Sequence, residues 1–285
     1  MTILVTGANG GFGKVLLPIL QKKYKGAVVG TGRSEVESAD YFSRDITDVS
    51  SVTELIARVK PSLIFHLAGS FTGLFENDFQ VNTLGAKYLF DSILSEKLDT
   101  RVVVVGSAAE YGAVLAEDNP IPETFPCRPV SVYGLTKNYQ TEMAKYYART
   151  SNIDVVIARV FNLAVPGLSQ RLFYGRAEAM IQAYKNKQIS KVEFGNLSSE
   201  RDYIGIEDAA TQLIAIAERG TLGEVYNVGS GLPKTMRSLL IEMLSKDGIS
   251  GDVIVEASSE SVGRKGFDVP RIYADISKVA SIQNN

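Results

Sequence analysis

Six short apolar runs recur along this 285-residue chain and restrict the folds that it can adopt. They are 3–7, 27–32, 63–69, 101–107, 154–160 and 224–230. Nearly every position within a run is apolar, as expected for parallel strands that helices cover on both faces. Between the runs, apolar residues at i, i+3 and i+4 spacing predict helices at 11–23, 49–60, 78–97, 131–150 and 206–219. This alternation indicates an α/β protein with a Rossmann-like, doubly wound parallel sheet.

A glycine-rich turn, TGANGGFG, follows the first predicted strand directly. Its Gly7, Gly10 and Gly13 form a GxxGxxG pattern, one residue different from the GxGxxG fingerprint of dinucleotide-binding folds. Glycines here permit a tight reversal and a close approach of the backbone to a pyrophosphate, and the following helix N-terminus favours negative charge. We therefore predict a dinucleotide cofactor, which Gly11 and Phe12 also contact. The alternative is a turn whose glycines are purely structural.

The second predicted strand ends in GTGRS, where NAD-selective proteins usually carry an acid that binds the ribose 2′-hydroxyl. Arg33 stands there instead, and a guanidinium suits the 2′-phosphate of NADP. We expect NADP(H) to be the preferred cofactor, with NAD(H) as the second option, and Asp45 and Ile46 to lie beside the adenine. The alternative is that Arg33 is a surface residue at a strand end.

The regular alternation ends after Val160. Residues 161–205 are rich in turn-forming residues, 206–229 return to a helix and a strand, and 230–285 contain another helical pattern and a short apolar run. We predict a dinucleotide-binding domain of residues 1–160 plus 206–229. A smaller α/β C-terminal substrate-binding lobe, 161–205 plus 230–285, would lie above the carboxyl edge of the sheet.

Composition argues against several kinds of partner. The formal net charge is −2 and no basic run is present, so nucleic acid is not an expected partner. One cysteine and one histidine, Cys127 and His66, offer neither a disulfide within the chain nor a metal site. No apolar stretch approaches the ~18 residues that span a membrane. Since the chain also starts directly with a predicted strand, we expect a cytoplasmic protein with no membrane partner.

A tyrosine and a lysine four positions apart, Tyr133 and Lys137, lie in the segment VSVYGLTKN. Such residues share one face of a helix, and a nearby ammonium can lower a tyrosine pKa from ~10 by about one to three units. Ser107 follows the fourth predicted strand, where ligands of such sheets bind, and its hydroxyl can hydrogen-bond a carbonyl. The pattern YxxxK is common on helix surfaces, so it predicts catalysis only together with Ser107 and the glycine-rich turn.

In this order, the motifs resemble those of the extended short-chain dehydrogenase/reductases over nearly the whole chain. The matching segments are TGANGGFG, HLAG, QVNTLG, GSAAEYG, YGLTK, ARVFN and RDYIGIEDAA. The resemblance implies an NAD(P)H-dependent oxidoreductase that acts on a CH–OH or C=O group, with Ser107, Tyr133 and Lys137 as catalytic residues. It also implies that the cofactor contacts Leu67, Ala68, Gly69 and Asn82, as well as Tyr133 and Lys137.

Five segments resemble one branch of that family, the GDP-4-dehydro-6-deoxy-D-mannose reductases: GSAAEYG, VIARVFNLAVPG, GNLSSERDYIGIEDAA, EVYNVGSG and DVPRIYADISK. This implies NADPH-dependent reduction of the C4 ketone of a nucleotide-linked 4-keto-6-deoxy sugar. The product would be GDP-D-rhamnose or its C4 epimer GDP-6-deoxy-D-talose, and a heptose substrate stays open. The implied substrate contacts are Ser107, Ala108, Asn162, Arg171, Arg201 and Arg271. Arg171 and Arg271 could instead form surface ion pairs.

Three other functions compete with this prediction. In related nucleotide-sugar dehydratases an acid follows the serine, where this chain has Ala108 and Ala109, and Glu110 would alternate to the other side of an extended segment. A 4-epimerase on the same fold is disfavoured because such epimerases favour an acid at the position of Arg33. The third is a non-catalytic NADP-binding regulator. By resemblance we also expect a homodimer, formed through helices 78–97 and 131–150.

Overall fold

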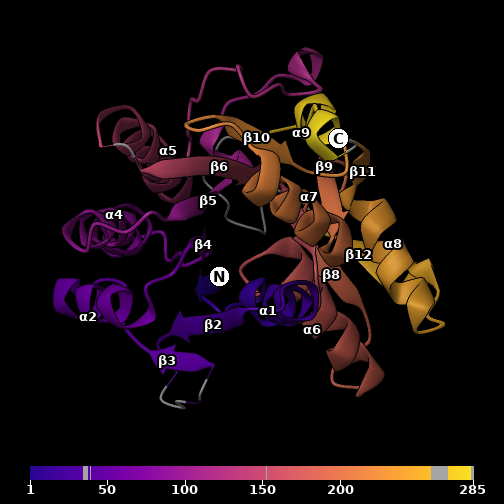
Figure 1. Cartoon of the computed structure of the whole chain (residues 1–285). Coiled ribbons are helices and arrows are strands. Elements are labelled where there is room, and N and C mark those ends of the chain that lie inside the picture. The colour runs from indigo at the N-terminus through magenta and orange to yellow at the C-terminus, as the bar shows by residue number, and fades with distance from the viewer. Residues whose placement is uncertain (35–37, 39, 152, 258–268, 284–285) are drawn as a thin grey trace.

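The computed structural model describes residues 1–34, 38, 40–151, 153–257 and 269–283 (Figure 1). At its centre is a seven-stranded sheet of order β10-β6-β5-β4-β1-β2-β3, in which every neighbouring pair is parallel. Apart from β10, this is the strand order of dinucleotide-binding α/β folds, with the topological switch between β1 and β4. The strands are β1 (Thr2–Thr6), β2 (Ala27–Gly32), β3 (Tyr41–Ser43), β4 (Leu63–His66), β5 (Arg101–Ser107), β6 (Asp154–Val160) and β10 (Val225–Val228).

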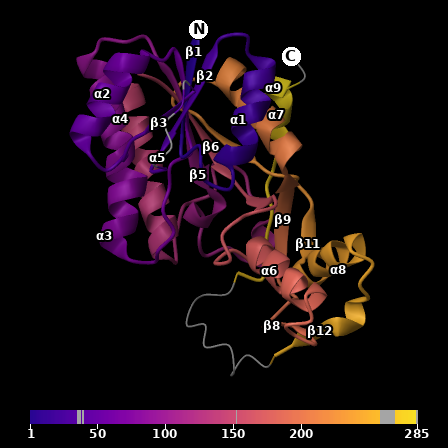
Figure 2. The same cartoon turned by 90° about the horizontal axis from the view of Figure 1, so that it is seen from below.

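Helices cover both faces of this sheet (Figures 1 and 2). One face carries α1 (Gly13–Lys23), α7 (Ile206–Arg219) and α9 (Ser277–Gln283), and the other carries α2 (Val49–Val59), α4 (Gly85–Ser95) and α5 (Val132–Thr150). Successive strand residues enter different cores: Ile3 and Val5 pack under α1, and Leu4 packs under α2. Both faces of β1 are therefore buried, which explains its continuous apolar run.

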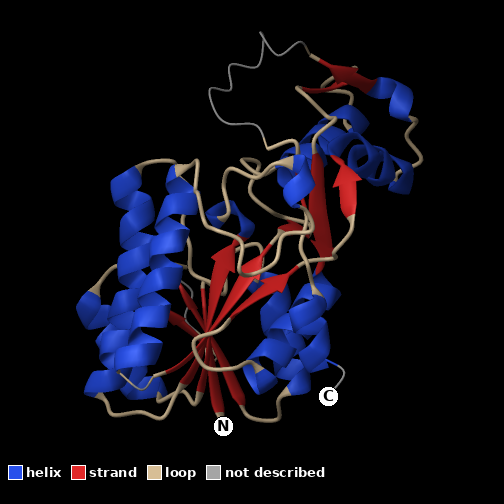
Figure 3. Ribbon diagram, turned by 90° about the horizontal axis from the view of Figure 1, so that it is seen from above, coloured by secondary structure: helices blue, strands red, loops and turns tan. Residues whose placement is uncertain are grey.

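A smaller lobe lies beyond the carboxyl ends of the large sheet (Figure 3). Its helices α6 (Phe173–Lys185) and α8 (Met236–Lys246) contribute to an apolar cluster of their own, which includes Tyr174 and Leu240. Its strands are β7 (Asn162–Ala164), β9 (Glu200–Gly205), β11 (Pro233–Thr235) and β13 (Arg271–Ile272) in one sheet, and β8 (Val192–Phe194) with β12 (Ile254–Glu256) in another. Chain segments that precede and follow α7 in the sequence together form this lobe. The division of the chain into two domains stays a prediction.

The six predicted strands are confirmed, with ends that differ by up to three residues. The predicted helix 78–97 is instead a series of α3 (Phe75–Asp78), a π-helical segment (Phe79–Leu84) and α4. The segment 161–205, for which the sequence predicts many turns and no particular element, contains α6 and the strands β7, β8 and β9. These elements are short or weakly patterned, and they are stabilised by packing on α8 and β12, which come much later in the chain. None of the helices in the described part of the chain is long and apolar enough to cross a membrane.

Candidate active site

Close backbone packing shapes the glycine-rich turn between β1 and α1. Gly7 has a φ of +68°, and a Cβ there would lie 2.8 Å from the Ala68 nitrogen. A Cβ at Gly13 would overlap the Gly7 carbonyl oxygen and the Ala8 backbone. The Gly10 N–H donates to the Gly7 carbonyl at 2.9 Å. Because only glycine fits at Gly7 and Gly13, the turn brings bare backbone to the start of α1.

A cleft of about 210 Å³ opens beside this turn. Tyr133 reaches it from α5, so the candidate proton donor shares the cleft with the start of α1. Backbone N–H groups at a helix start bind phosphate oxygens, and the glycines leave room for a pyrophosphate to approach them. The residues present thus fit a dinucleotide. The lining residues are Gly7, Gly10, Gly11, Phe12, Gly13, Leu67, Gly69, Ser70, Phe71 and Tyr133.

Tyr133 lies in the first turn of α5, which Ser131 caps by accepting the Gly134 N–H at 3.0 Å. Its ring meets that of Phe71 edge to face, with centroids 5.0 Å apart. Burial raises the pKa of Tyr133 to about 12, while a hydrogen bond with the Ser107 side chain lowers it. Tyr133 therefore keeps its proton at neutral pH and can act as a general acid.

Lys137, one helical turn after Tyr133, is directed toward β5. Its ammonium donates to the Val105 carbonyl at 2.6 Å and to Gln140 Oε1 at 2.5 Å. Burial lowers the pKa of Lys137 to about 8, and the charge of Glu110 opposes this shift. The expectation that Lys137 lowers the Tyr133 pKa is wrong for this arrangement, since burial of the phenol dominates and the ammonium is bound elsewhere.

Ser107 ends β5, and its side chain hydrogen-bonds the Tyr133 phenol. Its hydroxyl oxygen accepts from the Ala109 N–H at 3.2 Å, and its own N–H donates to Glu110 Oε1 at 2.7 Å. A serine hydroxyl has one proton and two lone pairs, and the bond that lowers the Tyr133 pKa uses that proton. To donate to a ligand oxygen beside Tyr133, the Ser107 hydroxyl would turn from the phenol to that oxygen.

Glu110 is turned into the core. The segment Ala108–Glu110 is a 3₁₀ helix, so the prediction of an extended strand is wrong. The fully buried carboxylate accepts from the Thr141 hydroxyl at 2.8 Å and pairs with the buried Arg159 at 2.9 Å. Its oxygens are engaged by the protein, so this acid is not available to a substrate.

A buried carboxylate fixes the loop that carries Phe71. Asp78 Oδ1 accepts from the Ser70 hydroxyl at 2.7 Å and from both the N–H and the hydroxyl of Thr72 at 2.8 Å. Asp78 Oδ2 accepts from the Gly73 N–H at 2.9 Å. Burial raises the pKa of Asp78, but these hydrogen bonds outweigh burial and hold the pKa below its usual value. The loop of residues 70–74 is therefore tied to α3.

Three further residues assigned to the cofactor contact other parts of the chain. Asn82 is buried, and its amide binds the Ser70 N–H at 2.7 Å and the Ser70 carbonyl at 3.0 Å. The Ala68 N–H donates to the Thr6 hydroxyl at 3.2 Å. Ile46 packs against α4 in the core under α2. These three are not among the residues that line the cleft of about 210 Å³, and neither are Ser107 and Lys137, so direct contact of all five with a ligand stays a prediction.

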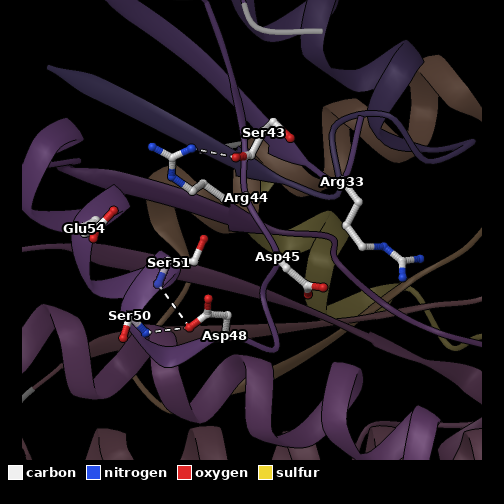
Figure 4. A pocket seen from close by; sticks show the side chains of 8 residues that line it. All are labelled: Arg33, Ser43, Arg44, Asp45, Asp48, Ser50, Ser51 and Glu54. Carbon is white, nitrogen blue, oxygen red and sulfur yellow. Dashed lines mark hydrogen bonds between the residues drawn. The ribbon is translucent and has the colours of Figure 1, made fainter. Parts of the chain in front are cut away.

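A second cleft, of about 500 Å³, lies at the ends of β2 and β3 and the start of α2 (Figure 4). Arg33 and Asp45, which the sequence analysis assigns to the adenosine end of the cofactor, line it together. Arg44 was not predicted; it donates to the Ser43 carbonyl at 2.7 Å, and its guanidinium points away from Arg33 (Figure 4). The lining residues are Arg33, Ser43, Arg44, Asp45, Asp48, Ser50, Ser51 and Glu54.

Two of the residues assigned to the substrate, Arg271 and Asn162, bind other residues of the smaller lobe in this structure. The Arg271 guanidinium forms an ion pair with the Glu200 carboxylate. In this structure its side chain therefore has the surface ion-pair role that was the alternative to substrate binding. The Asn162 amide donates to the Asp202 carbonyl at 3.1 Å. Neither residue lines the clefts described above.

Arg171, Arg201 and Ala108 complete the assigned set. Arg171 extends from the lobe and donates to the Phe71 carbonyl at 2.7 Å, which brings a cation to the loop beside Tyr133. Arg201 donates to the Glu200 carbonyl at 2.9 Å. Ala108 is buried directly after Ser107. The structure thus brings Arg171 toward the cleft and leaves Arg201 within the lobe.

No role of Phe71, Gln140 or Arg159 is predicted from the sequence motifs. Arg159 could have been found, because a cation inside the apolar run DVVIARV requires a buried partner. For Phe71 and Gln140 there is no comparable signal. Phe71 lies in the loop that Asp78 binds, and Gln140 contacts Lys137, which joins α5 to β5 through the Val105 carbonyl.

The sequence matches the model of the NAD dependent epimerase/dehydratase family over residues 3–229. GDP-6-deoxy-D-talose 4-dehydrogenase from Aggregatibacter actinomycetemcomitans is 27% identical over 290 residues, which cover 100% of this chain and 92% of that protein. GDP-6-deoxy-D-mannose reductase from Pseudomonas aeruginosa is 26% identical over 207 residues, which cover 70% of this chain and 67% of that protein.

A solved structure also has this architecture. RMD from Pseudomonas aeruginosa, complexed with NADPH, matches with a TM-score of 0.83 at 20% sequence identity, over 99% of this chain and 91% of that one. At this identity the match shows the fold. It confirms the predicted Rossmann-like sheet with flanking helices.

Proposed function

The chain belongs to the NAD dependent epimerase/dehydratase family, and from this we propose that it is an NADPH-dependent 4-ketoreductase of a nucleotide-linked 6-deoxy sugar. The proposed substrate is GDP-4-dehydro-6-deoxy-D-mannose, and the product is GDP-D-rhamnose or its C4 epimer GDP-6-deoxy-D-talose. The observation that carries the proposal is the cleft in which a protonated Tyr133 meets the glycine-rich turn. The names of the two relatives, both for GDP-6-deoxy sugars, support the choice of substrate.

The position of Glu110 favours reduction over dehydration. Dehydration needs an acid or base that moves a proton on the sugar beside the oxidised carbon. Ala108 and Ala109 follow Ser107, and the next residue, Glu110, is paired with Arg159 in the core. A ketoreductase needs a hydride source and a proton donor, and Tyr133 provides the second.

When bound in the cleft beside Tyr133, the reduced nicotinamide would supply the hydride for C4 of the sugar. Tyr133 donates its phenolic proton to the ketone oxygen, so that the C=O group becomes CH–OH. Ser107 donates a hydrogen bond to the same oxygen, where negative charge grows in the transition state. Lys137 binds the nicotinamide ribose, and the glycine-rich turn at Gly10 to Gly13 binds the pyrophosphate.

On the substrate side, we assign the diphosphate to Arg171 and Arg201. The planar guanidinium suits phosphate oxygens, and Arg171 already reaches the loop beside Tyr133. Asn162 and Arg271 act within the lobe, where they hold β9 against its neighbours. In this proposal the lobe supplies the nucleotide contacts and the large sheet supplies the chemistry.

The direct test is to add GDP-4-dehydro-6-deoxy-D-mannose to the purified protein with NADPH or NADH and to follow nucleotide oxidation. We expect oxidation with NADPH and a product whose C4 configuration NMR assigns to the rhamnose or the talose sugar. Nucleotide binding without oxidation would favour the non-catalytic regulator. Interconversion of GDP-D-rhamnose and GDP-6-deoxy-D-talose, added in place of the ketone, without net oxidation of NADPH would favour the 4-epimerase.

A further inference from the structure

The ammonium of Lys137 is held by two uncharged oxygens, the Val105 carbonyl at 2.6 Å and Gln140 Oε1 at 2.5 Å. Lys137 is 3% exposed and Gln140 is fully buried, so water does not compete with these acceptors. An ammonium removed from water is stabilised by the hydrogen bonds that replace its hydration. Two of its three protons are used in this way, and the third is left for a ligand.

Gln140 follows Lys137 by three residues on α5 and therefore lies beside it on the helix surface. An ammonium only donates, so the Gln140 amide must turn its oxygen toward Lys137. The amide nitrogen then has no hydrogen-bond partner among the residues that the structure describes. An apolar side chain would fill the same core position without leaving a donor unpaired. The hydrogen bond from Lys137 to Gln140 Oε1 offsets the free-energy cost of burying the unpaired amide nitrogen.

Three titratable groups surround Lys137, on different elements. His66 on β4 is neutral, because burial, with the charge of Lys137, lowers its pKa to about 3. Glu110, after β5, favours the charged lysine but is already paired with Arg159. Tyr133 on α5 keeps its proton. The acceptors in direct contact, Val105 and Gln140, are therefore the local groups that hold the ammonium.

We propose that Gln140 is a positioning residue for the reaction: its side-chain oxygen, with the Val105 carbonyl, keeps Lys137 charged and aims its third proton at the ribose of the bound nucleotide. The inference deepens the proposed function and rests on it for the identity of the nucleotide. It predicts that the amide oxygen of Gln140, rather than its bulk, sets the pH range over which Lys137 works.

The pH dependence of NADPH binding tests this without the sugar. Kd is measured by nucleotide fluorescence from about pH 6 to pH 10 for the natural protein, Gln140→Met and Gln140→Glu. Because Lys137 has a pKa of about 8, binding of the natural protein should weaken as pH rises through that value. Methionine removes an acceptor from a charged donor, which disfavours the ammonium and should move the midpoint down by about one pH unit. Glutamate favours the ammonium and should move it up.

Turnover provides a second readout. Tyr133, with a pKa of about 12, stays protonated near pH 8, so an alkaline limb of kcat/KM there belongs to Lys137. In the Gln140 variants the alkaline limb of kcat/KM should shift in the same direction as the pH midpoint of NADPH binding. Lys137→Met should remove the pH dependence of NADPH binding near pH 8. Coincident midpoints in the natural protein and both Gln140 variants would overturn the proposal. If Gln140→Met does not fold, the upward shift of Gln140→Glu decides alone. Shifted midpoints without reduction of the sugar would refute the proposed function and leave this inference standing.

Discussion

At the level of single residues, the proton of Tyr133 decides which role the cleft can perform. Its pKa of about 12 makes it a donor at neutral pH. The Ser107 side chain, which hydrogen-bonds the phenol, favours release of that proton as the substrate oxygen becomes basic. This arrangement suits reduction of a ketone, in which the phenol starts protonated.

Tyr133→Phe removes this proton and keeps the ring against Phe71. We expect turnover to fall by about 10²–10⁴-fold, because general acid catalysis is lost. NADPH binding should change little, since the ring still closes the cleft. Steady-state rates and nucleotide fluorescence measure the two effects, and a variant with full activity would contradict the assignment.

Arg33 is expected to set the preference for NADPH. Arg33→Ala should weaken NADPH binding by about 10- to 100-fold and leave NADH binding nearly unchanged, because only NADPH has the 2′-phosphate. Arg44→Ala is the matched control, because it removes another cation from the same cleft. The Arg44 guanidinium binds the Ser43 carbonyl and points away from Arg33 (Figure 4). Equal losses for both nucleotides, or an equal effect of the two substitutions, would argue against a 2′-phosphate site at Arg33.

At the level of elements, the loop of residues 70–74 depends on α3 through one carboxylate. Asp78→Asn would keep one oxygen and place an NH₂ group against the Gly73 or Thr72 donors. We expect a loss of about 1–3 kcal/mol in the free energy of unfolding at pH 7, measured with urea. Activity should fall too, since the loop holds Phe71 against Tyr133.

The free energy of unfolding at acid pH distinguishes the loss of the Asp78 charge from general damage to the core. The pKa of Asp78 is lower in the folded state than its ordinary value of 3.8, so its contribution is complete above that value. The contribution is lost as pH falls through the folded-state pKa. The stability difference between the natural protein and Asp78→Asn should therefore narrow at low pH. A difference that stays constant from neutral to acid pH would show that Asp78 does not act through its charge.

The elements also show how far sequence reasoning extends. The strands of the large sheet are predictable because each is buried on both faces and reads as a continuous apolar run. Ser107 and Tyr133 are predictable because strand ends and helix starts converge at one edge of such a sheet. Helix α6 and strand β3 are not, since they are stabilised by later segments or are too short for a pattern. The rotamers of Lys137 and Glu110 follow from their buried partners, Gln140 and Arg159, which no linear motif contains.

At the level of the whole molecule, the smaller lobe contacts the loop beside Tyr133. Arg171 of the smaller lobe donates to the carbonyl of Phe71, whose ring contacts Tyr133. A substrate diphosphate bound by Arg171 would therefore lie close to the proton donor. Under the proposed function, this proximity would let nucleotide contacts on the smaller lobe hold the sugar next to Tyr133.

The outer surface of α3, α4 and α5 is expected to form a homodimer interface. Four large apolar side chains on it are exposed to solvent, at 42% for Tyr139, 55% for Tyr146, 39% for Leu94 and 39% for Phe75. Exposed apolar side chains gathered on adjoining helices favour burial against a second surface, and a second copy of this chain presents the same face. Light scattering at several concentrations should therefore give the mass of two chains.

Tyr146→Glu should weaken such a dimer by about 30-fold or more, because a charge replaces an aromatic ring that association would bury. Leu232→Glu is the control, since Leu232 is 67% exposed in the turn before β11, in the smaller lobe. Both variants should keep the unfolding temperature of the isolated chain, because neither position is part of a core. A natural protein that is monomeric at every concentration, or a dimer that Tyr146→Glu leaves intact, would place the interface elsewhere or remove it.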